Sequence, residues 1–390
     1  MVGPLDNIDT SLRLRERLRN IAAAGPSNRV GLFPDPSSRH WRFDPSAGPD
    51  SVAVIDHPTV DVGDPGSTVT NFAVAPGYQA PLHIYLANPW LLIDFDHGLG
   101  GGKLMTELIA AVTSDVPAFA EPQPKTDCHS PVLRAFAHTA RVAPRELIRA
   151  FDLERAPNQP ASSGSFDESA VVVYAHSDAG FLAELRARRD REMSGASVLA
   201  TITAAMLGAL NSVGITTESA VGIMVDLSRY LPEGTGTLSN FLGIAPISTS
   251  QPFDARDIGD QIDRYTNGYR SLVRYGLATM VNMRKPTAKS VVKQCDNGRA
   301  RLVVTDHGET SAARKIRWAG PEGGRVFVRH APVGYSNQIT LAVNRVGHQL
   351  HLSASFYAWQ FDRDSVSAAL RRVVAGPISR IPEICGRSPD

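Results

Sequence analysis

The sequence has few cysteines and almost no excess charge, and each shortage excludes a class of protein. Three cysteines occur in 390 residues (Cys128, Cys295 and Cys385), and they are far apart. Neither a disulfide framework nor a Cys-x-x-Cys metal site is therefore predicted. A formal net charge of +1 gives no overall attraction to nucleic acid or to a membrane surface. No metal site and no nucleic-acid partner are expected.

Long hydrophobic runs are also missing. The apolar runs are far shorter than the roughly 18 residues of a membrane-spanning helix. The first residues, MVGPLDNIDTSLRLRERL, lack the hydrophobic segment of a secretion signal. The simplest expectation is a cytoplasmic protein without a membrane span.

The length of the chain predicts two lobes, because 390 residues exceed what a single hydrophobic core usually accommodates. The segment 156–169, APNQPASSGSFDES, has the composition of a linker and lies near the middle. We therefore expect an N-terminal lobe over residues 1–160 and a C-terminal lobe over residues 161–390.

Helical and strand periodicities alternate in both halves, which predicts a mixed α/β fold. The expected strands cover 41–44, 51–55, 66–75, 81–87, 90–95, 170–174, 221–227, 241–245, 339–345 and 348–357. The expected helices cover 9–24, 103–114, 130–150, 178–193 (capped by Ser177 or Asp178), 196–212, 255–283 and 364–375.

Residues 90–112 predict a buried strand, a glycine turn that carries His97, and a helix. Leu91, Ile93 and Phe95 alternate along the strand, and the helix has apolar residues at three- and four-residue spacing. A histidine in such a turn can act as a general base, although a lone histidine at a strand end more often serves only the local structure. The glycines do not form a phosphate loop, because Lys103 is followed by Leu104 instead of Ser or Thr.

Several stretches resemble the CoA-dependent acyltransferase superfamily, which includes chloramphenicol acetyltransferase, condensation domains of peptide synthetases, and alcohol- or polyketide-acylating enzymes. His97 and Gly102 match the ends of its His-x-x-x-Asp-Gly signature. Three further landmarks follow in the family's order. They are Val225–Pro232 with Ser239–Gly243, then Gly334–Asn337, which is similar to a channel-lining strand, and finally Leu350–Asp362.

Two positions depart from the signature. Asp96 stands where many members have a second histidine, and Gly101 stands where they have an aspartate that pairs with an arginine. We expect that the turn was rebuilt around glycine, so that an aspartate at position 101 would strain it.

The resemblance implies two chloramphenicol-acetyltransferase-like lobes with a channel between them. It further implies a biosynthetic acyltransferase or condensation enzyme that moves an acyl group from a thioester to an alcohol or amine, with His97 as general base. No tightly bound cofactor is implied; coenzyme A or a phosphopantetheine arm is a co-substrate. The partners would be a small-molecule acceptor and either an acyl-CoA or an acyl carrier protein. The implied substrate-binding or channel-lining residues are Asp96, Gly101, Gly102, Arg229, Asn240, Ser336 and Asn337.

Other interpretations remain open. The departures at Asp96 and Gly101 also fit a non-catalytic binding or scaffold protein, although the retained His97 argues against it. The same fold could instead perform altered chemistry such as cyclisation. Locally, Arg229 could simply pair with Asp226, and Asn240 and Asn337 could serve backbone groups.

Residues 284–329 carry 11 Lys and Arg residues against four acidic ones. This stretch could dock the phosphates of coenzyme A or the acidic face of a carrier protein, or it could be a solvated surface.

Overall fold

The computed structural model describes residues 1–6, 8, 10–35, 40–57, 59–73, 80–113, 130–152, 162–163, 170–251, 253–283, 292–295, 298–309 and 314–375. The chain divides into two compact units, and neither is continuous in sequence. We call them the N-unit (Met1–Pro131, Pro232–Phe241 and Glu309–Val328) and the C-unit (Val132–Leu231, Leu242–Gly308 and Arg329–Asp390).

The sequence predicts a single boundary between residues 160 and 161, within the segment 156–169. Of that segment only Ser162 and Ser163 are described. The division into the segments 1–160 and 161–390 therefore stays a prediction.

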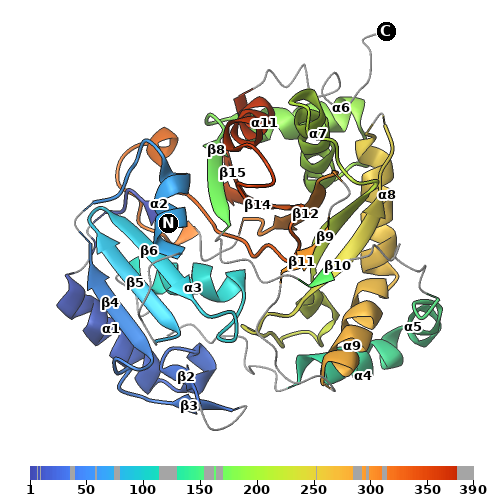
Figure 1. Ribbon diagram of the computed structural model, residues 1–390. Coiled ribbons are helices and arrows are strands. Elements are labelled where there is room, and N and C mark those ends of the chain that lie inside the picture. The colour runs from blue at the N-terminus through green and yellow to red at the C-terminus, as the bar shows by residue number, and fades with distance from the viewer. Residues whose placement is uncertain are drawn as a thin grey trace. The chain divides into compact units, whose positions relative to one another are not determined.

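A five-stranded sheet forms the centre of the N-unit, in the order β13-β1-β6-β5-β4; Figure 1 shows its strands β4, β5 and β6 side by side. Its strands are β1 (Val2–Gly3), β4 (Val52–Asp56), β5 (Leu82–Ala87), β6 (Trp90–Phe95) and β13 (Val326–Phe327). β4 runs parallel to β5, and the other pairs are antiparallel. The helices are α1 (Ser11–Ala23), α2 (Pro65–Ala73) and α3 (Gly102–Thr113), with two short turns η1 (Pro26–Asn28) and η3 (Glu322–Gly324). A small ribbon pairs β2 (Leu32–Pro34) with β3 (Trp41–Phe43).

A six-stranded sheet forms the centre of the C-unit, in the order β10-β9-β12-β14-β15-β8. Its strands are β8 (Val171–His176), β9 (Ala220–Asp226), β10 (Leu242–Ser248), β12 (Arg301–Asp306), β14 (Gln338–Val346) and β15 (Gln349–Phe356). β12 runs parallel to both of its neighbours, and the other pairs are antiparallel. β7 (Ser162–Ser163) and β11 (Lys293–Gln294) form a separate short pair.

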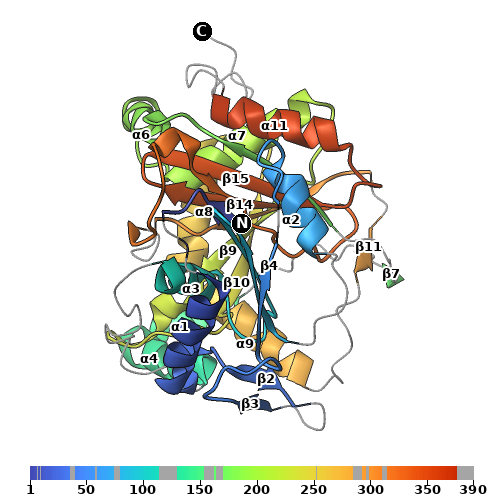
Figure 2. The same ribbon diagram turned by 90° about the vertical axis from the view of Figure 1, so that its left-hand side faces the viewer.

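The helices of the C-unit are α4 (Pro131–Val142), α5 (Pro144–Arg149), α6 (Phe181–Glu192), α7 (Val198–Ser212), α8 (Ala255–Asn267), α9 (Arg270–Met283) and α11 (Arg363–Ala375), with the short turn η2 (Leu227–Tyr230). The nearly all-apolar sequence of α7 predicts a buried helix, and this is confirmed, because residues such as Leu207 and Leu210 are fully buried. α7 contacts α8, α11 and β12, while α11 contacts β8 and β15. Figure 2 shows α7 and α11 next to each other above β15. The two helices therefore cover the C-unit sheet.

Two local predictions are wrong. Residues 66–75 were expected to form a strand, but α2 begins at Pro65. The Asp64 carboxylate accepts a hydrogen bond from the Ser67 N–H at 2.9 Å, which is a helix N-cap followed by proline, and this signal outweighs the short apolar alternation. α6 is preceded by Gly180 without a side-chain cap, so neither Ser177 nor Asp178 caps it.

The region 255–283 is two helices instead of one. α8 ends at Asn267 and α9 begins at Arg270. Between them Tyr269 has φ 56°, in the left-handed region that interrupts a helix. No helix in the described part of the chain combines the length and apolar character that crossing a membrane requires.

The burial of α7 gives a stability prediction. Leu207→Ala should lower the free energy of unfolding by about 2–5 kcal/mol, because it leaves a cavity beneath the sheet. Leu133→Ala on α4 should change it by no more than about 0.5 kcal/mol, because Leu133 is 69% exposed. Urea denaturation followed by circular dichroism measures both. Equal losses would contradict the assigned core.

Candidate functional site

The glycine turn follows directly after β6. The strand pairs with β5 as far as Phe95, and the Asp96 N–H then donates to the Pro81 carbonyl oxygen at 2.8 Å. The Leu99 N–H donates back to the Asp96 carbonyl oxygen at 2.9 Å, which closes the turn. The Asp96 side chain accepts a hydrogen bond from the Gly98 N–H at 2.6 Å. Asp96 therefore stabilises the turn that holds His97, and its substrate contact stays a prediction.

The His97 side chain is exposed at the start of this turn. Its ring lies edge-on to the Phe95 ring, with 5.6 Å between the centroids. Nδ1 lies 3.4 Å from the Gly100 carbonyl oxygen. In the tautomer that carries its proton on Nδ1, this nitrogen donates to Gly100, and Nε2 keeps a lone pair. The geometry can therefore supply a proton acceptor at Nε2.

Two glycines allow the turn to pack closely against its surroundings. A Cβ atom at Gly98 would overlap the Trp41 ring, and one at Gly100 would overlap the Leu238 carbonyl oxygen. Leu99 between them is buried. Only glycine fits at positions 98 and 100 without movement of a neighbour.

Gly101 is different, which corrects the expectation from the sequence. The φ angle of Gly101 lies outside the left-handed region. A Cβ atom at this position would lie 3.6 Å from the Asn240 Cα atom, which is an ordinary van der Waals distance. Its N–H donates to the Leu238 carbonyl oxygen at 3.2 Å. The structure thus brings Gly101 and the exposed Asn240 together, and Gly102 begins α3. The close approach occurs at Gly98 and Gly100 instead of Gly101.

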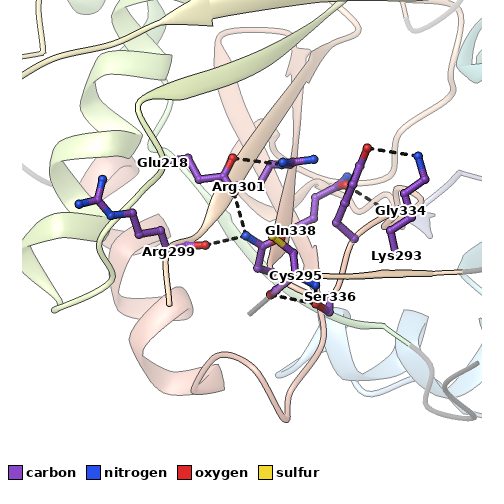
Figure 3. A network of polar contacts seen from close by, with 10 residues as sticks. Glu218, Lys293, Cys295, Arg299, Arg301, Gly334, Ser336 and Gln338 are labelled. Carbon is purple, nitrogen blue, oxygen red and sulfur yellow. Dashed lines mark hydrogen bonds and ion pairs between the residues drawn. The ribbon is translucent and has the colours of Figure 1, made fainter. Parts of the chain in front are cut away.

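Ser336 and Asn337 lie in the C-unit and are fully buried, and Figure 3 shows the Ser336 side chain beside Cys295. They form a turn before β14 instead of a strand. The Ser336 hydroxyl accepts from the Cys295 N–H at 2.8 Å. Asn337 Nδ2 donates to the Glu218 carboxylate at 2.9 Å and to the Arg299 carbonyl oxygen at 2.7 Å. Both side chains thus serve the interior of the C-unit, and substrate contact stays a prediction.

Arg229 lies in η2 and is exposed. The Asp226 carboxylate accepts from the Ser228 N–H at 2.9 Å, and among the described residues no ion pair joins Asp226 to Arg229. The alternative of a local ion pair is therefore wrong. Arg229 instead lines a cavity of about 270 Å³ in the C-unit, together with His138 and Tyr269.

The basic stretch 284–329 is not a uniform surface of unpaired charge. Arg301 pairs with Glu218 at 3.1 Å, Arg314 with Glu309 at 3.0 Å and Arg317 with Asp6 at 3.2 Å. Arg329 is buried, and burial lowers its pKa to about 9. Arg284, Lys285 and Lys289 lie outside the described residues. A docking role for the stretch stays a prediction.

Sequence reasoning missed the residues that shape the turn and the cavity. Trp41 and Leu238 limit the space around the glycines, while His138 and Tyr269 line the cavity beside Arg229. They come from segments far apart in the sequence, so local periodicity carries no signal for them. Within the described part of the chain, no group of His, Cys, Asp and Glu side chains is arranged to hold a metal ion.

No family model and no curated protein sequence matches the chain. Solved structures match over nearly its whole length. The condensation domain for chain release from the enacyloxin polyketide synthase has a TM-score of 0.53 at 15% identity, covering 100% of this chain and 79% of its own. Trichothecene 15-O-acetyltransferase from Fusarium sporotrichioides has a TM-score of 0.57 at 12% identity, covering 99% of this chain and 89% of its own. The EpoB cyclization-docking bidomain from Sorangium cellulosum has a TM-score of 0.58 at 15% identity, covering 96% of this chain and 78% of its own.

An epimerization domain from tyrocidine synthetase B and an X-domain from teicoplanin biosynthesis also match. The chain therefore has the two-lobed, mixed α/β fold of condensation domains and CoA-dependent acyltransferases. The resemblance drawn from the sequence is confirmed at the level of the fold. At identities of 12–15%, the likeness does not extend to the reaction.

The glycine turn gives a prediction about stability. Gly100→Ala should lower the free energy of unfolding by about 1–3 kcal/mol, because the new methyl group overlaps a backbone oxygen. Gly101→Ala should stay within about 0.5 kcal/mol of the wild type, and Gly101→Asp within about 1 kcal/mol, because a Cβ atom there meets Asn240 and Ser239 only at ordinary contact distances and α3 begins beside it. Urea denaturation of the three variants compares them. A Gly101→Asp loss as large as that of Gly100→Ala would contradict this assignment.

The two asparagines provide a second comparison. Asn337→Ala should lower the free energy of unfolding by about 1–3 kcal/mol, because the buried Glu218 carboxylate and the Arg299 carbonyl oxygen lose a donor. Asn240→Ala should change it by no more than about 0.5 kcal/mol, because Asn240 is exposed. Thermal and urea melts of both variants measure the difference. Indistinguishable melts would refute the structural role of Asn337.

Proposed function

We propose that the protein is an acyltransferase that moves an acyl group from a coenzyme A or carrier-protein thioester to a small-molecule alcohol or amine. The observation that carries the proposal is His97. It is exposed in a turn fixed by backbone packing, and its Nδ1 lies toward the Gly100 carbonyl oxygen, which leaves Nε2 to accept a proton. The fold, which is that of enzymes with a histidine in the matching signature, supports the same reaction.

In this reaction Nε2 of His97 removes the proton from the acceptor as its oxygen or nitrogen attacks the thioester carbonyl carbon. The carbon–sulfur bond then breaks, and the thiolate takes the proton from the imidazolium. The ester or amide and the free thiol are the products, so charge and protons balance. Coenzyme A or a phosphopantetheine arm serves as co-substrate and not as a resident cofactor.

An alcohol acceptor is supported by the likeness to an enzyme named an O-acetyltransferase. The carrier-protein donor rests on the resemblance to condensation domains of peptide synthetases. The proposal includes both donors, coenzyme A and a carrier protein, because the glycine turn is equally compatible with either. A role in natural-product or lipid biosynthesis is part of the same proposal.

Two other functions have specific support. Altered chemistry such as cyclisation is favoured by the departures at Asp96 and Gly101 and by the likeness to a cyclization domain. A binding role is favoured by the X-domain, which has the same fold and was solved in complex with OxyB. These alternatives predict different outcomes in the assay below.

The test uses the full chain with a panel of acyl-CoA and acyl-carrier donors, and alcohol and amine acceptors. Thiol release and product mass are followed. His97→Ala should lower the rate by about 10²- to 10⁴-fold, the usual contribution of a positioned general base. His57→Ala is the matched control, because His57 is in the same unit and its Nδ1 also faces a carbonyl oxygen, that of Thr59 at 2.8 Å. It should leave the rate unchanged.

Each outcome decides between the functions. A His97→Ala rate equal to that of the wild type would rule out the general base. Turnover with a dehydrated or ring-closed product would assign cyclisation. No thiol release from any donor would reject acyl transfer and favour the binding role.

A further inference from the structure

A cavity of about 270 Å³ in the C-unit has no role in the proposed acyl transfer. It lies where α4, η2 and the end of α8 meet, and its lining includes His138, Arg229, Tyr230, Asn267 and Tyr269. Four features of this cavity define the kind of ligand that it fits: its charge, its aromatic wall, the backbone of Tyr269 and its size.

The first feature is charge. Arg229 is exposed, and within the described part of the chain no carboxylate lies at ion-pair distance from it. No Asp or Glu is among the lining residues. His138 Nδ1 lies 3.2 Å from the Tyr230 carbonyl oxygen, so its N–H donates there. The cavity therefore carries an uncompensated guanidinium, whose planar donors match a carboxylate.

The second feature is an aromatic wall. The Tyr230 and Tyr269 rings lie with centroids 5.4 Å apart at an angle of 46°. Burial raises the pKa of Tyr230 to about 12, so the phenol stays neutral, and its O–H donates to the Thr266 carbonyl oxygen at 2.6 Å. The hydroxyl of Tyr230 is thus committed to the protein, and both tyrosines belong to the lining of the cavity, where an apolar or aromatic group can pack.

The third feature is the backbone of Tyr269. Its φ of 56° lies in the left-handed region, which glycine adopts far more easily than tyrosine. The neighbouring Gly268 has φ −86° and does not use its freedom there. The ring of Tyr269 packs against Leu147, Ala150 and Val273, which fixes its position. A tyrosine kept in an unfavourable conformation at a cavity wall points to a use for its side chain.

The fourth feature is size. Pockets for drug-sized ligands usually measure about 300–1,000 Å³, so 270 Å³ suits a smaller molecule. A larger neighbouring cavity of about 740 Å³ shares Asn267 but is lined by both signs of charge, including Asp260, Asp263 and Arg264. Of these two cavities, the smaller one has Arg229 and no acidic residue in its lining.

We propose that the smaller cavity binds a small aromatic carboxylate, with the carboxylate on Arg229 and the ring against Tyr230 and Tyr269. This proposal does not depend on acyl transfer at His97. It concerns equilibrium binding and requires no turnover.

The test measures binding of benzoate to the full chain by ligand-observed NMR and calorimetry. Benzoate should bind saturably, and Arg229→Gln should weaken it at least about 10-fold, since a charge-assisted pair is lost. Arg371→Gln on α11 is the control, because this exposed arginine does not line the cavity. Tyr269→Gly should also weaken benzoate binding while it relieves the backbone. Thermal melts establish that each variant is folded.

Two comparison ligands complete the test. Benzamide, which lacks the charge, and acetate, which lacks the ring, should each bind at least about 10-fold more weakly than benzoate. The proposal is overturned if benzoate does not saturate below about 10 mM or if Arg229→Gln binds it as the wild type does. Inorganic phosphate binding more tightly than benzoate would also overturn it, since the cavity would then be a phosphate site.

Discussion

The glycine turn and the segment Pro232–Phe241 meet backbone against backbone, and the candidate site depends on this contact. The Gly101 N–H donates to the Leu238 carbonyl oxygen, and the same oxygen leaves no space for a Cβ atom at Gly100. The Gly100 carbonyl oxygen in turn lies beside Nδ1 of His97. The orientation of the histidine is thus linked to a close approach that only glycine permits. Arg29 secures the segment by donating to the Ser239 hydroxyl at 2.9 Å.

This contact explains how the turn can differ from the family signature. In the family, an aspartate at the position of Gly101 pairs with an arginine and holds the turn. Here the Asp96 carboxylate accepts from the Gly98 N–H inside the turn, and the backbone of Gly101 provides the outer contact. In this turn the carboxylate next to His97 is that of Asp96, and position 101 has none. Such a turn holds His97 without an aspartate at position 101.

The prediction of the fold from the sequence succeeded where the signal is local. It failed where contacts between distant segments decide the structure. The strand 90–95 and the helix after it follow from periodicity alone, and both form. β12 was missed, because the apolar run Leu302–Thr305 lies within a stretch interpreted as a basic surface. It is nevertheless the central parallel strand of its sheet. The sequence also carries no local signal that the segment Pro232–Phe241 belongs to the N-unit. The residues that surround the glycine turn could therefore not be identified from the sequence.

Asn337 and Arg229 show why a motif alone does not identify a ligand contact. Both match the family's pattern, yet Asn337 directs its amide hydrogens to Glu218 and to a backbone oxygen inside the C-unit. Arg229 makes no ion pair with the described residues and lies at a cavity with an aromatic wall. A buried donor that is already satisfied gains little from a ligand, whereas an exposed guanidinium at a concave surface gains a partner without losing one. Burial and the partners that a side chain already has, and not the match to a motif, therefore distinguish Asn337 from Arg229.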